Sequence, residues 1–231
     1  MNFSKRTHAL ISGISLLIMA LAAGYSYGYV YNSLVIPDNP SATLTNLDNS
    51  LVMFGSSVIG WLVILVTDIL VAWSLYKYFV TVNHKISIAT GLVRVVYSAF
   101  LAFAIYHLGT AWKILYVALP DASTFMDLFN AFEKYWSLGL IVFGLHLIGL
   151  GYLSLKSNSV PTWIGWLLYI AGISYSVIHG ANAIVPDAVD TIALAEMIMG
   201  IPMAVAELGL AVWLLWKGGK KPNNIKAGRM A

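Results

Sequence analysis

Hydrophobic and polar positions alternate on a long scale along this chain, with six extended apolar stretches separated by short polar segments. Each stretch contains at least 23 residues, enough for an α-helix rising ~1.5 Å per residue to cross a hydrocarbon layer ~30 Å thick. We therefore predict an all-α fold, a polytopic bundle of six transmembrane helices in a single domain over residues 1–231. The predicted helices cover about residues 9–31, 50–79, 86–115, 131–155, 162–184 and 191–216.

The composition agrees with this pattern. Hydrophobic residues make up 59% of the 231 positions and charged residues only 10%, too few to cover the surface of a water-soluble domain. The chain has no cysteine, which excludes disulfides and thiolate chemistry. Its net charge of +3 comes from loops without interleaved aromatic residues, so no nucleic-acid partner is expected. The expected partners are the lipid bilayer and a small-molecule or lipid ligand, and the oligomeric state stays open.

The basic residues predict the orientation. Of the 13 lysines and arginines, ten fall on the side that holds both termini, whereas only Lys113 and Lys134 fall on the other side. By the positive-inside rule, both termini are cytoplasmic and residues 217–231 form a basic cytoplasmic tail. We expect a multi-pass protein of the cell membrane, the cytoplasmic membrane of a bacterium. Lys5 and Arg6 before the first apolar stretch resemble a secretory signal, but the length of that stretch favours a spanning helix.

Two outer loops are longer than the rest. Residues 32–49 are interpreted as a turn followed by a polar segment, and residues 121–130 as a short capped helix. Either loop could cover the mouth of a site or be an ordinary solvated connection.

Four ionisable residues, Asp68, Arg94, His146 and Glu207, lie on four different predicted helices. Each is nine or ten residues from a basic residue that ends its helix, which places all four about 15 Å from one membrane face. Because charge is costly at that depth, such residues usually face the bundle interior and mark a functional site. The set is neutral only if the histidine is protonated or one acid keeps its proton, which suggests a proton switch. Alternatively, the four residues form a fixed ion-pair network that holds the helices together.

Further positions share a helix face with the central residues or belong to stripes of small and polar residues. A proline at position 202 predicts a kink or break near Glu207, and the pair Gly24 and Gly28 predicts a helix-packing contact. The residues expected to line the pocket are Tyr97, Ser98, Tyr169, Ser176, Gly200 and Met203.

A second set of polar residues, His107, His179 and Glu196, shares a depth near the outer interface, 19 to 22 residues from the inner ends of their helices. Two histidines and one carboxylate match a catalytic zinc site, although no two of them come from one short metal-binding motif. The alternative is that the histidines are solvated or interfacial. No cofactor other than such a divalent metal is expected, because phosphate-binding and nucleophile motifs are absent from the sequence.

Several segments resemble one protein family. They are Asp68-Ile-Leu-Val-Ala-Trp-Ser-Leu-Tyr, the region of Arg94, Phe143-Gly-Leu-His146 with the following Leu-Ile-Gly-Leu-Gly-Tyr-Leu, Val160-Pro161 with the Ala171-Gly172 helix, and Glu207-Leu-Gly-Leu-Ala-Val-Trp-Leu-Leu-Trp-Lys-Gly. Over nearly its whole length the chain resembles the DUF4386 family of bacterial integral membrane proteins, which has no assigned activity. The resemblance implies the fold, the membrane location and that the four central positions are family features. The family pattern has an acid three positions after the arginine, where this chain has Tyr97, which argues against a role for a third central carboxylate.

The favoured function is binding or transport of a small or lipophilic solute, with possible proton coupling. Asp68 and Glu207 would accept protons or ligand, Arg94 would be their counter-charge, and His146 would be the switch. One alternative is a membrane-embedded enzyme acting on a lipid or isoprenoid, through His146 and a carboxylate or through the outer metal set. The other is an accessory membrane subunit, and the sequence leaves enzymatic activity open.

Overall fold

The protein is a bundle of membrane-spanning helices. The computed structural model describes residues 3–37, 39–117, 120–185 and 187–220, and within these ranges all the regular structure is helical. Six helices are long and apolar enough to cross a membrane, which confirms the predicted all-α, six-span fold. The predicted tail, residues 217–231, lies mostly outside the described residues, which end at Lys220.

The first span is α1 (Lys5–Ala23), continued by the π-helical segment η1 (Gly24–Tyr31) and the single turn α2 (Asn32–Leu34). The other spans are α4 (Leu51–Phe79), α5 (His84–Val117), α6 (Ala122–Lys156), α7 (Thr162–Ile184) and α8 (Val189–Trp216). The 34 residues of α5 correspond to about 51 Å, so this helix must tilt or project beyond the hydrocarbon layer.

Both predictions for the outer loops were wrong in part. Residues Pro40–Asn49 form a helix, α3, where a polar segment was expected. Pro40 suits the first helical position because its missing N–H needs no partner there, and the Asn39 side chain caps the helix by accepting from the Ala42 N–H at 3.0 Å. The short helix expected at 121–130 is instead the beginning of α6. Asp121 does cap it, but the sequence that follows contains no proline and the helix simply continues.

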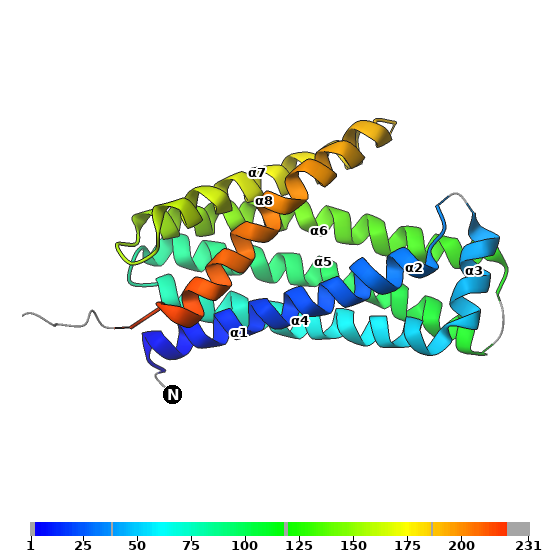
Figure 1. Cartoon of the computed structure of the whole chain (residues 1–231), viewed down its shortest axis with the longest axis horizontal. Coiled ribbons are helices and arrows are strands. Elements are labelled where there is room, and N and C mark those ends of the chain that lie inside the picture. Colours follow the sequence, from blue (N-terminus) through cyan, green and yellow to red (C-terminus); the bar gives the residue numbers. More distant parts are fainter. Residues whose placement is uncertain (1–2, 38, 118–119, 186, 221–231) are drawn as a thin grey trace, which may run out of the picture.

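Figure 1 shows α1, α4, α5 and α6 running along the long axis of the molecule, with α7 on one side and α8 running obliquely from the end of α7 to the N-terminal end of α1. Helix α8 crosses α1, and the two inner ends meet. There the Arg6 guanidinium donates to the carbonyl oxygens of Leu214 at 2.9 Å, Leu215 at 2.5 Å and Gly218 at 2.8 Å. These carbonyls have no partner within the helix, so Arg6 caps α8 and ties the first span to the last.

Helices α6 and α7 approach each other through glycines. A Cβ on Gly172 of α7 would lie 2.6 Å from the carbonyl oxygen of Gly144 on α6, so the backbones are too close for any side chain there. The face of α7 that carries Tyr169 and Ser176, which were expected to line a pocket, therefore lies against α6.

One local prediction of helix geometry failed, and a second was tested only in part, since a break but not a kink at Pro202 can be judged from the helix bounds. A Cβ on Gly24 or Gly28 would meet nothing within 4 Å, so this pair makes no packing contact. The residues lie in the π-helical segment η1, which changes the direction of the side chains relative to an α-helix. Pro202 does not break α8, which continues from Val189 to Trp216.

Candidate functional site

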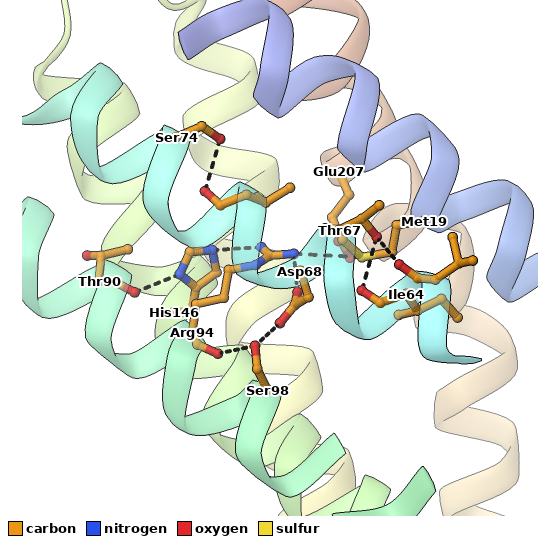
Figure 2. A network of polar contacts seen from close by, with 12 residues as sticks. Met19, Ile64, Thr67, Asp68, Ser74, Thr90, Arg94, Ser98, His146 and Glu207 are labelled. Atoms are coloured by element: carbon orange, nitrogen blue, oxygen red, sulfur yellow. Dashed lines mark hydrogen bonds and ion pairs between the residues drawn. The ribbon is translucent and has the colours of Figure 1, made fainter. Parts of the chain in front are cut away.

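Three of the four central residues meet inside the bundle (Figure 2). Asp68 comes from α4, Arg94 from α5 and His146 from α6. The Arg94 Nη2 lies 2.6 Å from Asp68 Oδ1, and the Arg94 Nη1 lies 3.0 Å from His146 Nε2. Asp68 and His146 are 0% exposed and Arg94 is 1% exposed. We call these three residues the buried trio.

The hydrogen bonds of His146 determine its protonation state. Its Nδ1 lies 2.9 Å from the carbonyl oxygen of Thr90, and because a carbonyl can only accept, Nδ1 carries a proton. Its Nε2 faces Arg94 Nη1, which can only donate, so Nε2 has no proton. The imidazole is therefore neutral and orients the guanidinium. A proton on Nε2 would place two N–H groups against each other, so this arrangement does not support His146 as the predicted switch.

The other polar groups of the buried trio are mostly paired, although Arg94 Nε has no hydrogen-bond partner. Asp68 Oδ2 accepts a hydrogen bond from the Ser98 hydroxyl, and the Arg94 guanidinium lies 5.1 Å from the centre of the Phe143 ring, which adds a cation–π contact. One carboxylate, one guanidinium and one neutral imidazole sum to zero charge. The gap beside His146, between α4, α5 and α6, has no room for a water molecule. The buried trio is thus a closed and neutral unit.

Glu207, the fourth central residue, is placed differently. It lies on α8, is partly exposed, and its hydrogen-bond partner is the Tyr175 hydroxyl, which donates to Oε1 at 3.4 Å. It is close enough to Arg94 and Asp68 for a coulombic interaction, yet in the described part of the chain it forms no ion pair. Between α8 and the buried trio lies Met19 of α1, whose sulfur is 3.7 Å from Arg94 Nη2. Glu207 is therefore a carboxyl without an ion-pair partner among the described residues.

The residues expected to line a pocket divide into three pairs. Tyr97 and Ser98 lie at the buried trio, with the Tyr97 ring centre 4.9 Å from that of Phe143. Gly200 and Met203 lie on α8 near Glu207, Met203 buried and Gly200 with open space around it.

The remaining two expected residues, Tyr169 and Ser176, pack against α6. The Ser176 hydroxyl donates to the carbonyl oxygen of Ile141 at 3.1 Å, and a Cβ on Gly151 would lie 3.1 Å from the Tyr169 ring. These two side chains therefore contribute to the contact between α6 and α7.

The outer metal set predicted from depth is not assembled. The His107 ring stacks on Tyr135 with 5.4 Å between ring centres, His179 Nδ1 lies 3.0 Å from the Ser137 hydroxyl, and Glu196 is exposed on α8. Among the residues that the structure describes, no three His, Asp or Glu side chains lie close enough together to hold a metal ion. The prediction failed because equal depth in the membrane does not give two side chains the same direction around their helices.

One feature near the site was missed by the sequence reasoning. Tyr27 of η1 stacks on Tyr31 and packs against Trp136 of α6, with ring centres 4.9 Å apart in both pairs. The Tyr31 hydroxyl donates to Glu133 of α6. These aromatic residues were interpreted as an interfacial belt, and the signal that could have distinguished them is the dense run of tyrosines between Gly24 and Tyr31.

Comparisons with known proteins identify relatives without an assigned activity. A family model described as "Domain of unknown function (DUF4386)" matches residues 11–218. A protein of the archaeon Archaeoglobus fulgidus named "Uncharacterized protein" is 30% identical over 164 residues, which cover 71% of this chain and 85% of that protein. The similarity therefore reaches beyond bacteria. No solved structure shows significant similarity to the chain.

Proposed function

The chain belongs to the DUF4386 family, whose function is unknown, and we propose that it binds a small lipophilic solute beside Glu207 and moves it across the membrane. The observation that carries this proposal is the contrast in charge at mid-depth. The buried trio is neutral and closed, whereas Glu207 is partly exposed and forms no ion pair among the described residues. An uncompensated carboxyl inside a membrane needs a proton or a cationic partner.

The arrangement of α8 supports access from the bilayer. At its inner end, α8 packs closely on α1, where a Cβ on Gly13 would lie 2.6 Å from the Leu215 side chain. Toward the outer end, the α7–α8 hairpin diverges from the other helices (Figure 1). The outer half of α8 exposes apolar side chains in several directions, among them Met197 (69%), Ile198 (54%) and Ile201 (73%). A lipophilic solute would approach Glu207 between α1 and α8.

The chemistry of the site favours a solute that brings a positive charge or donates a hydrogen bond. Glu207 would accept this group, and Tyr175 would position the carboxyl through its hydroxyl. A proton and a cationic solute cannot both occupy the same carboxylate, so binding of one displaces the other. This competition would couple solute movement to protons, with Glu207 and not His146 as the exchanging group.

A second candidate is a structural role, in which the chain is an accessory subunit. It is favoured by the complete burial of the buried trio, which links α4, α5 and α6 through charged and hydrogen-bonded contacts. In that case Glu207 would have no ligand, and changing it would affect neither binding nor transport.

The test uses purified protein in liposomes with tetraphenylphosphonium as a lipophilic cation. We expect saturable binding and an uptake rate that depends on a pH gradient. Glu207→Gln removes the negative charge with little change in size and should reduce both by about tenfold or more, since hydrogen bonds to charged groups contribute ~1.5–3 kcal/mol. The control is Glu196→Gln, which makes the same change at an exposed position on the same helix.

Three outcomes are informative. Loss of binding and uptake in Glu207→Gln alone supports the proposal. Equal losses in Glu207→Gln and Glu196→Gln would indicate a general effect of charge on α8 and contradict a specific site. Wild-type protein that neither binds nor moves the cation would contradict the proposed solute class and favour the structural candidate.

A further inference from the structure

A polar cavity that does not include Glu207 lies at the N-terminal end of α1 and the C-terminal end of α4. It has a volume of about 300 Å³, and its lining includes Lys5 and His8 from α1 with Trp73 and Lys77 from α4. It shares no lining residue with the site at Glu207, so what it binds is independent of the proposed solute.

The cavity is positively charged without local compensation. In the described ranges, neither Lys5 nor Lys77 has a carboxylate within ion-pair distance. The sequence contains no Asp or Glu at all in residues 1–37 or 69–120, the segments that build this end of α1, α4 and α5. The N-terminus of α1, capped by the Ser4 side chain, adds the positive end of a helix dipole. Anions are therefore attracted to this cavity.

His8 gives the cavity a specific polar group. Its side chain is only 6% exposed, and its Nδ1 is buried without a hydrogen-bond partner. The ring is held between two aromatic side chains, with centres 6.1 Å from Phe3 and 5.0 Å from Trp73. Because the His8 residue lines the cavity, a ligand there would contact its imidazole.

We propose that this cavity binds a phosphate-bearing anion, the headgroup of an anionic phospholipid of the inner leaflet. Lys5 and Lys77 supply the charge, and the His8 imidazole donates a hydrogen bond to a phosphate oxygen. Basic pockets between transmembrane helices on the cytoplasmic side are suited to such headgroups. Phe3 and Trp73 are 46% and 38% exposed beside the cavity, where they would pack against the first carbons of the acyl chains. The bound lipid would join the inner ends of α1 and α4.

The experiment is native mass spectrometry of the full chain in detergent, titrated separately with phosphatidylglycerol and phosphatidylcholine. We expect phosphatidylglycerol to bind more tightly. The double variant Lys5→Gln/Lys77→Gln should lose roughly 25-fold in phosphatidylglycerol affinity, since each surface lysine contributes roughly fivefold. His8→Leu, which keeps the size of the side chain, should also weaken binding. The control Lys156→Gln, at the inner end of α6 and outside the cavity, should bind as the wild type does.

Inorganic phosphate separates the two sources of the anion. If phosphate does not displace phosphatidylglycerol, the ligand is the lipid. If phosphate displaces it and alone stabilises the wild type but not the double lysine variant, the cavity is an anion site for a soluble phosphate. Equal affinity for the two lipids, or a double variant that binds phosphatidylglycerol like the wild type, would overturn the proposal. The Glu207→Gln variant should bind phosphatidylglycerol normally, so this proposal can fail independently of the proposed function.

Discussion

Asp68 of the buried trio and Glu207 are both carboxyl residues predicted to lie at mid-depth, yet their environments differ. Asp68, Arg94 and His146 are at most 1% exposed and satisfy one another through short contacts. Glu207 is partly exposed and has one long hydrogen bond, from Tyr175 at 3.4 Å. The charged groups of the buried trio are compensated by contacts inside the protein, whereas the Glu207 carboxyl has only the hydrogen bond from Tyr175.

The difference shows that depth in the membrane alone does not identify a ligand site. A buried charge whose partner is in place contributes to the architecture, because its desolvation is offset within the protein. A charge at the same depth without a partner is available to something that arrives from outside. The contrast also applies to the helix contacts, because α7 is packed tightly on α6 while the outer half of α8 is largely uncovered.

The largest expected effect comes from breaking the buried trio. Arg94→Met leaves Asp68 buried without its counter-charge and should lower the free energy of unfolding by about 3–5 kcal/mol. Glu207→Gln should change it by less than about 1 kcal/mol, because it alters a single long hydrogen bond at a partly exposed position. Both values can be measured by denaturant titration in mixed micelles.

A compensating variant tests the explanation. Asp68→Leu combined with Arg94→Met removes both charges and should recover most of the stability lost in Arg94→Met, since an unpaired charge is no longer buried. A double variant as unstable as the single one would show that packing, and not charge pairing, dominates at the buried trio.

An intermediate effect on stability is expected from glycine substitutions, one at the α6–α7 contact and one on the uncovered part of α8. Gly172→Ala would place a Cβ 2.6 Å from the Gly144 carbonyl oxygen and should destabilise the protein by about 1–3 kcal/mol as α6 and α7 are pushed apart. Gly200→Ala, on the uncovered part of α8, meets nothing within 4 Å and should be neutral or stabilising by up to about 1 kcal/mol. Thermal unfolding of both variants against the wild type checks this order. Equal destabilisation would mean that α8 is packed more closely than the described residues indicate.

The smallest effect on stability is expected for Asp121, an exposed residue that caps the N-terminus of α6. Hydrogen bonds from the Ser123 hydroxyl and from the Thr124 backbone N–H hold the pKa of this carboxyl well below its usual range. A depressed pKa means that the ionised cap stabilises the folded state at neutral pH, and that this contribution is lost as the pH falls through the folded-state value. Asp121→Ala should therefore lower the melting temperature slightly at pH 7, and the difference should shrink in acid. Asp121→Asn, which still caps but does not titrate, should lack this pH dependence.

Much of the fold follows from one-dimensional patterns. Six apolar stretches of sufficient length predicted the six spans, and the depth of Asp68, Arg94 and His146 predicted that they could meet. The wrong predictions concern features that depend on contacts between helices. The helix of Pro40–Asn49 packs on α4 and α6. Residues 121–130, which were predicted to form a separate short helix, are continuous with the rest of α6. The metal set of His107, His179 and Glu196 failed because the three side chains point to different neighbours.

By itself, the sequence determined which segments cross the membrane and how deep each ionisable side chain lies, because helix rise and hydrophobicity are local properties. Only the tertiary structure decided that Arg94 pairs with Asp68, that the Thr90 carbonyl holds His146 neutral, and that Glu207 forms a hydrogen bond with Tyr175 but no ion pair among the described residues. These outcomes depend on how helices rotate and approach one another. Rotation and approach are set by contacts such as the Gly144–Gly172 crossing, between residues far apart in the chain.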